Sequence, residues 1–209
     1  MALVKYNNNS ISGITAASSL PSAALTLIKS QTASSSATIS FVDGTSDVVL
    51  DSTYPIYLFK FINIHQATDD EHFQFQGNAA GGSGYNETIT SSYFETYHRE
   101  NGATTSLAYD TNDDLAQSTS FQRLMPYADN DNDSSGCGEL WLFNPSSTTF
   151  VKHFMATTQY VLNSSTNYTI NSYIGGYFNT TSAIDEIQFK MSSGNIDAGT
   201  IKLYGIKDS

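Results

Sequence analysis

The chain has 209 residues and a formal net charge of -11. Only 14% of its residues are charged, against roughly 25% in an average soluble domain. Its nine Lys and Arg residues are scattered singly, so no basic stripe exists to neutralise nucleic-acid phosphates or to bind an anionic membrane surface. No apolar run approaches the roughly 18 residues of a membrane helix. We therefore expect neither nucleic-acid binding nor membrane insertion.

The remaining composition favours strands. There are 13 Tyr and 12 Phe residues among many Ser, Thr, Asn and Gly residues, a mixture that suits pleated strands joined by polar turns. The single cysteine, Cys137, excludes an intrachain disulfide framework. The first ten residues turn polar before the apolar core of a signal peptide can form. We expect folding in a reducing cytoplasm.

The first predicted segment is an arm. Residues 1–23 are small and polar, and their apolar residues are too sparse for a strand or an amphipathic helix. From Ala24 onward, apolar and polar residues alternate as in half-buried strands, first over 24–30 and then over 37–42. The strongest element is Ile56–Ile64, which is apolar on nearly both faces and therefore predicted to lie at the centre of a sandwich.

Gly, Asn, Asp and Ser clusters separate the remaining elements. Two polar segments, 77–90 and 109–135, are longer than hairpin loops and are expected to be functional, subunit-contacting or mobile. A short helical period is present only near Leu115 to Leu124. The further predicted strands are 47–51, 72–76, 92–98, 139–143, 149–155, 173–178, 184–191 and 200–206. About ten short strands without alternating helices predict an all-β fold, a single jelly-roll-like β-sandwich over 24–209 behind the N-terminal docking arm 1–23.

One loop resembles a calcium site. Asp129, Asp131 and Asp133 alternate in a polar loop, and alternate carboxylates can converge on one hard cation. The EF-hand pattern also requires Gly at its sixth position and Glu at its twelfth, where this chain has Ser134 and Leu140. A solvated loop is therefore the favoured interpretation and calcium the alternative. No other metal or cofactor is expected.

Catalytic patterns are weak, and we expect no enzyme. The four histidines lack the short spacings of a zinc site. The stretch 81–85 departs from the nucleophile elbow because Tyr85 stands where the second glycine is required. Carboxylate pairs that are expected to be solvated are Asp113–Asp114 and Asp185–Glu186. If chemistry existed, it would be sought first in the loop 69–71 and then near Asp129.

Aromatic side chains in polar loops offer a different chemistry, because their flat faces can stack on sugar rings. Trp141 alternates with Leu140 and Leu142 and is assigned to the core or to a subunit interface. The candidates for stacking on a host surface glycan are Tyr85, Tyr97, Tyr109 and Tyr127.

Four segments carry a resemblance to a known family. The closing segment Ala183–Ile206 resembles the C-terminal signature of a family of small tailed-bacteriophage proteins found in marine phages. The stretches Asp51–His65, Leu142–His153 and Gly175–Thr181 resemble the same family in the same order. The resemblance implies a jelly-roll-like domain, assembled as a homotrimer and displayed on the particle. It transfers no catalytic residue.

The sequence thus predicts a virion structural protein, made in the host cytoplasm and displayed on the particle exterior. A tail-associated attachment or host-recognition module, similar to a tail fibre, is the leading interpretation, with other tail or capsid proteins as partners. Because the chain has no coiled-coil or repetitive shaft, a capsid decoration (cement) protein is the close alternative. A glycan-binding module and a glycan-degrading enzyme are further alternatives.

Overall fold

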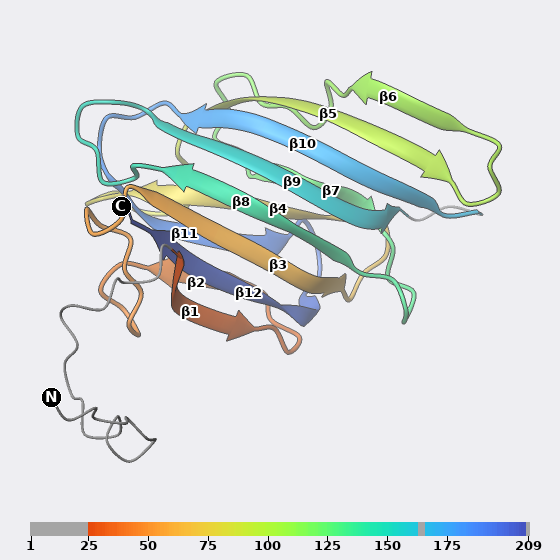
Figure 1. Cartoon of the computed structure of the whole chain (residues 1–209), viewed down its shortest axis with the longest axis horizontal. Coiled ribbons are helices and arrows are strands. Elements are labelled where there is room, and N and C mark those ends of the chain that lie inside the picture. The colour runs from red at the N-terminus through yellow and green to blue at the C-terminus, as the bar shows by residue number, and fades with distance from the viewer. Residues whose placement is uncertain (1–24, 163–165, 208–209) are drawn as a thin grey trace, which may run out of the picture.

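A computed structural model describes residues 25–162 and 166–207, and these form twelve strands (Figure 1). The predicted docking arm, 1–23, lies outside the described residues. The part described contains no helix long and apolar enough to cross a membrane. The strands are β1 (Leu25–Thr32), β2 (Ile39–Val42), β3 (Ile56–Gln66), β4 (Glu71–Ala79), β5 (Ile89–Arg99), β6 (Thr105–Tyr109), β7 (Gln122–Ala128), β8 (Gly136–Phe143), β9 (Lys152–Leu162), β10 (Tyr168–Phe178), β11 (Ile184–Met191) and β12 (Ile196–Ile206).

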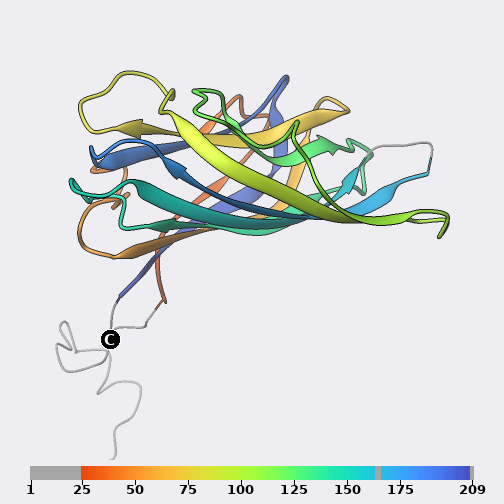
Figure 2. The same ribbon diagram turned by 90° about the horizontal axis from the view of Figure 1, so that it is seen from above.

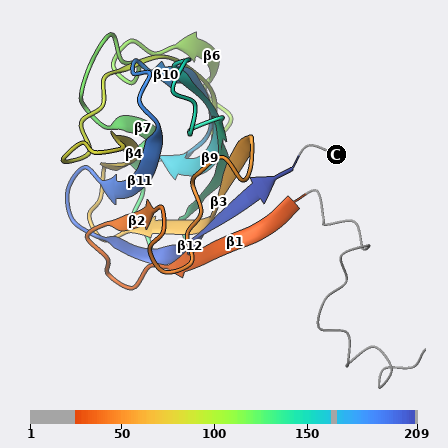
Figure 3. The same cartoon turned by 90° about the vertical axis from the view of Figure 1, so that its left-hand side faces the viewer.

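The strands form two layers that pack face to face (Figures 2 and 3). The larger layer has the order β1-β12-β3-β8-β9-β10-β5-β6, and the smaller layer has the order β2-β11-β4-β7. Every pairing is antiparallel. One residue pair, Ala128 of β7 with Leu162 of β9, joins the layers into a continuous, nearly closed sheet.

The strand order is that of a jelly roll. The connections β1–β2, β3–β4, β7–β8 and β11–β12 each pass from one layer to the other, so β1-β12-β3-β8 faces β2-β11-β4-β7. This is the double Greek-key arrangement of an eight-stranded jelly roll. The additional strands β9, β10, β5 and β6 widen the larger layer. The predicted all-β, jelly-roll-like sandwich is confirmed.

Phenylalanine rings fill the centre of the sandwich. Phe189 of β11 contacts five other Phe rings, with centroids 5.3 to 6.2 Å apart. Those rings come from both layers, because alternate residues of each antiparallel strand point inward. All six are at most 2% exposed. The five partners are Phe41, Phe59, Phe61, Phe73 and Phe75.

The predicted central strand is also confirmed, with a difference on one face. β3 lies between β12 and β8, and its Phe59 and Phe61 point into the core. Leu58 points to the opposite side, where its cross-strand neighbours are Trp141 and Tyr204. Leu58 is only 3% exposed, but no further layer of the described chain lies over that side. The apolar residues on both faces of β3 therefore correctly indicated a central strand, although only one of these faces packs against the protein core.

Three segments differ from the sequence predictions. The residues with a short helical period form a loop followed by β7, because Gln122, Leu124 and Thr158 belong to the packing between the layers. The mostly exposed strand β6 was missed, since it pairs only with β5 at the sheet edge. Residues 47–51 form no strand: Asp47 has a φ of 64°, while Val48 and Leu50 still enter the core.

The phenylalanine cluster gives a stability prediction. Phe189→Ala should lower the free energy of unfolding by about 3–5 kcal/mol, because it leaves a cavity among five rings. Phe150→Ala removes the same side chain where it is 70% exposed, so its effect should stay within about 0.5 kcal/mol. Urea denaturation followed by tryptophan fluorescence measures both. Equal effects of the two substitutions would contradict the assigned core.

Candidate functional site

The loop of the predicted calcium site is held by its own hydrogen bonds. The Asp129 carboxylate accepts hydrogen bonds from the Ser134 hydroxyl (2.6 Å), the Asn167 amide (3.2 Å) and the Asp131 backbone (3.2 Å). Asp129 is buried, whereas Asp131 and Asp133 are exposed. Within the described ranges, no three His, Cys, Asp or Glu side chains gather closely enough to hold a metal ion. Calcium binding by Asp129, Asp131 and Asp133 stays a prediction, and their geometry adds no support to it.

The four candidate tyrosines lie in four different places. Tyr85 interacts through its hydroxyl with Ser40 and Glu186, and burial raises the pKa of that hydroxyl. Tyr109 donates a hydrogen bond to Asp114 at the exposed edge strand β6. Tyr97 and Tyr127 are also separate from each other, on β5 and at the end of β7. The structure does not assemble the four into one stacking platform.

Tyr127 and Tyr97 each have an aromatic neighbour. The Tyr127 ring packs edge-on against His72 at 4.6 Å, and the His72 Nδ1 atom accepts a hydrogen bond from the Tyr127 backbone. Tyr97 packs edge-on against Tyr168 of β10, with ring centroids 5.6 Å apart. Of the four candidates, Tyr97 is the one that lines a cavity together with a second tyrosine.

The predicted carboxylate pairs serve structural contacts. Asp113 forms an ion pair with Arg123 at 2.7 Å, while its neighbour Asp114 accepts the hydrogen bond from Tyr109. In the loop 69–71, Glu71 accepts a hydrogen bond from the Ser192 hydroxyl. Burial raises the pKa of Asp185. None of these contacts positions two carboxyl groups toward a common cavity.

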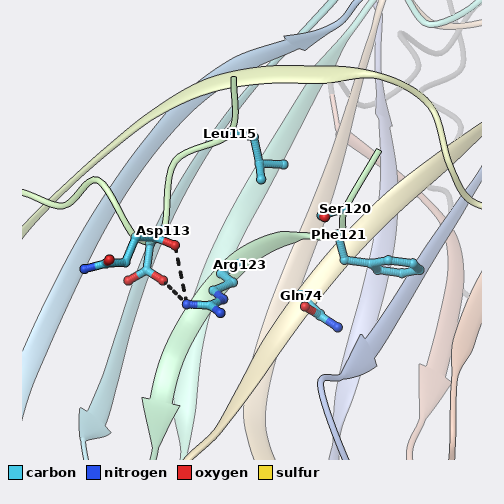
Figure 4. A pocket seen from close by; sticks show the side chains of 7 residues that line it. Gln74, Asp113, Leu115, Ser120, Phe121 and Arg123 are labelled. Atoms are coloured by element: carbon cyan, nitrogen blue, oxygen red, sulfur yellow. Dashed lines mark hydrogen bonds and ion pairs between the residues drawn. The ribbon is translucent and has the colours of Figure 1, made fainter. Parts of the chain in front are cut away.

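The Asp113–Arg123 ion pair lines a cavity of about 410 Å³ between the loop after β6 and strands β4 and β7 (Figure 4). The Asp113 side chain is only 2% exposed, and burial raises its pKa while Arg123 opposes the rise. The acid and the base of this cavity neutralise each other, so it presents no free charge to a ligand. The other side chains labelled there are Gln74, Leu115, Ser120 and Phe121.

A second cavity, of about 280 Å³, was missed by the sequence analysis. It lies on the inward side of β5, β9 and β10, and Glu95 is its single acidic residue. Burial, followed by repulsion from Asp110 and Asp113, raises the pKa of Glu95 to about 7. Tyr93, Glu95 and Tyr97 are alternate residues of β5, so their side chains point to the same, inward side of the sheet. The two-residue period of this strand was therefore the sequence signal that could have placed Glu95 inward.

The outward side of the larger layer carries an extended apolar surface. Cross-strand pairs align its residues in two neighbouring rows over β1, β12, β3, β8 and β9, which lie side by side in Figure 1. Leu25, Leu27 and Met155 are 42%, 51% and 59% exposed. We call this surface the apolar outer patch: Leu25, Leu27, Ile56, Leu58, Trp141, Phe143, Met155, Tyr204 and Ile206.

Charge is sparse around the apolar outer patch. The adjoining row runs from Ser30 through Lys202 and Lys60 to Glu139 and Thr157. Glu139 is its single acidic residue, in a chain with 20, and it pairs with Lys60 at 3.4 Å. The negative charge of the protein is therefore concentrated away from this surface.

Comparison with protein-family models, with curated proteins and with solved structures gives no match.

Glu95 gives a prediction for the pH dependence of stability. The folded protein holds the Glu95 proton more tightly than the unfolded chain, whose glutamate pKa is near 4.5. The contribution of this carboxyl to stability is therefore complete below pH 4.5 and is lost as the pH rises to about 7. Glu95→Gln cannot ionise, so its melting temperature should exceed that of the wild type at pH 8 and match it at pH 4.

Differential scanning calorimetry at both pH values measures this effect. The matched control is Glu139→Gln, on the opposite side of the same sheet, where removal of the Lys60 partner should bring no gain at pH 8. A melting-temperature gain for Glu95→Gln that is as large at pH 4 as at pH 8 would contradict the assignment.

Proposed function

We propose that this protein is a non-enzymatic structural protein of a bacteriophage particle. It assembles as a homotrimer on the particle exterior, where it acts as a tail-associated attachment module. Jelly rolls recur in viral coat and lectin domains, which is compatible with this role. A shared fold does not by itself determine function, which depends on the residues at the surface. The observation that carries the proposal is the apolar outer patch.

The patch has the composition of a subunit contact. Nine apolar residues adjoin one another in two rows, and three of them are more than two-fifths exposed. Contiguous apolar surface of this kind marks interaction sites in soluble proteins, and Trp, Tyr, Phe and Met are enriched in interfaces. Trp141, which the sequence assigned to a core or an interface, belongs to this surface.

A second copy of the chain suits the patch better than an unrelated partner of similar acidity. Two copies that each carry a net charge of -11 repel one another over most of their surfaces. Repulsion is weakest where acidic residues are fewest, and the patch with its adjoining row has Glu139 alone. In the proposed homotrimer, this face of one copy contacts a different face of the next copy, and the threefold rotation closes the ring after three subunits.

The position of Leu25 links the patch to the docking arm. Leu25 pairs with Ile206 at one corner of the patch, so the described part of the chain begins beside the proposed contact. In a homotrimer, the three arms would therefore start near subunit contacts. We propose that they bind a common partner in the tail. Capsid decoration is the alternative, and it uses the same trimer and arms on a different part of the particle.

Charged substitutions in the patch should weaken self-association. We expect Leu27→Lys combined with Met155→Lys to convert the trimer into monomers at micromolar concentration, because each Lys would have to lose its hydration in the contact. Both positions are more than half exposed, so the monomer should fold normally. Mass photometry over a range of concentrations gives the subunit number. A wild-type protein that stays monomeric throughout would refute the homotrimer in solution.

Ala116→Lys combined with Thr119→Lys is the control for the patch variant. Ala116 and Thr119 are exposed in the loop that hydrogen-bonds to Gln76 of the smaller layer, so the same two charges are added away from the patch. The control should assemble as the wild type does. Dissociation of the control to the same degree would show that added charge, and not the patch, determines assembly.

Deletion of residues 1–23 tests the docking arm. The truncated protein should keep the melting temperature of the full chain, because the described strands begin at Leu25. Its incorporation into particles should be abolished. The measurement is immunoblotting of purified virions produced with either form, and normal incorporation of the truncated protein would exclude the docking role.

A further inference from the structure

The cavity beside Glu95 combines one carboxyl group with aromatic and aliphatic walls. Its lining consists of Glu95, Tyr97, Leu162, Tyr168 and Ile170. The two tyrosine rings meet edge to face at 5.6 Å, so they present differently oriented surfaces to the space between the strands. The cavity lies on the inward side of the larger layer, opposite the apolar outer patch, so an inference about it is independent of the proposed assembly.

Glu95 lacks a cationic partner within the described residues. The ion pairs there are Lys60–Glu139 and Arg123–Asp113, so Arg123 already serves another carboxylate. The Arg99 guanidinium lies over the Tyr168 ring at 5.2 Å and donates a hydrogen bond to the Thr166 carbonyl.

The remaining groups around Glu95 do not compensate its charge. Its nearest polar neighbour is the buried Tyr93 hydroxyl, 3.5 Å from the carboxylate, which also bonds to Ser172. The charged groups that act on Glu95 from the loop after β6 are Asp110 and Asp113, and both are acidic. Glu95 is thus a half-buried carboxyl group whose environment favours the arrival of a positive charge.

We propose that this cavity binds a small organic ammonium ion, with Glu95 as its counter-ion and the Tyr97 and Tyr168 rings against its apolar substituents.

The chemistry of the lining favours a cation over other ligands. An anion would be repelled by Glu95 and, from the loop after β6, by Asp110. A neutral sugar needs several hydrogen-bonding groups around its ring, but Leu162 and Ile170 supply none. A substituted ammonium ion needs one negative charge and the faces of aromatic rings, which attract cations through their quadrupole.

The cavity volume limits the size of the ligand. About 280 Å³ lies just below the range of drug-sized small-molecule sites, roughly 300–1,000 Å³. A trimethylammonium or similar alkylammonium group fits this cavity volume better than an oligosaccharide does. The sequence suggested that Tyr97 stacks on a glycan, whereas in this proposal Tyr97 contacts an organic cation.

Choline and its neutral isostere, in which carbon replaces the quaternary nitrogen, separate charge recognition from hydrophobic contact. The full-length protein is titrated with each compound at pH 8.5, with binding followed by isothermal calorimetry and by NMR shifts of the Tyr97 and Tyr168 rings. Choline should bind and shift both rings, and the isostere should bind at least tenfold more weakly. Choline affinity should fall about thirtyfold at pH 5.5, because only a few per cent of Glu95 is then ionised.

Two variants test the residues. Glu95→Gln should abolish the preference for choline over its isostere, whereas the matched Glu139→Gln, on the opposite face, should keep it. Tyr97→Leu should weaken choline binding several-fold without changing its pH dependence. Because a folding defect would mimic lost binding, each variant must show the far-ultraviolet circular dichroism spectrum of the wild type and a cooperative thermal transition before titration.

If choline binds, three results would still overturn the proposal. They are equal binding of the isostere, unchanged choline affinity in Glu95→Gln, and tighter binding of glucose or galactose than of choline with shifts of the same two rings. A failure of choline to bind would also reject it, and would leave the trimer and its patch unaffected.

Discussion

Contact between the Phe189 ring and the rings of both layers is the interaction on which the structure depends. β11 belongs to the smaller layer, and through Phe189 it reaches Phe59 and Phe61 on the central strand of the larger one. Once these rings are inside, the two-residue period of a strand fixes the direction of every other side chain along β3 and its neighbours. The core therefore also decides what the outer surface of the larger layer presents.

The two surfaces for which a function is proposed follow from that constraint. On β3 and β8, the residues that alternate with the core residues are Leu58 and Trp141, which places an apolar surface outside. Strand β5 belongs to the part of the larger layer that extends beyond the eight jelly-roll strands. There, inward residues such as Glu95 and Tyr97 line a cavity and do not form a tightly packed core. The extra strands thus line the cavity for which a ligand is proposed, while the jelly-roll strands, together with β9, carry the proposed contact surface.

Much of the fold was predictable because its strands alternate strongly. β11 was predicted at its observed bounds, and β3 was correctly placed at the centre. The candidate site was less predictable. Tyr97 was selected as an aromatic residue, but its partner Tyr168 is 71 residues away and joins it only through the pairing of β5 with β10. The spacing of the Asp residues at 129–133 suggested a calcium site. In the structure, the Asp129 carboxylate accepts hydrogen bonds from Ser134 and Asn167 instead.

The sequence by itself determined that the chain is all-β, that Ile56–Ile64 lies centrally, and that basic residues are few and scattered. These are local or compositional properties, which strand period and residue counts report directly. Only the tertiary structure decided that the outward apolar residues of β1, β12, β3, β8 and β9 adjoin one another and that Glu95 lies in one cavity with Tyr97 and Tyr168. Such neighbours are set by antiparallel register between strands distant in sequence, and no pattern within a single strand specifies its partner.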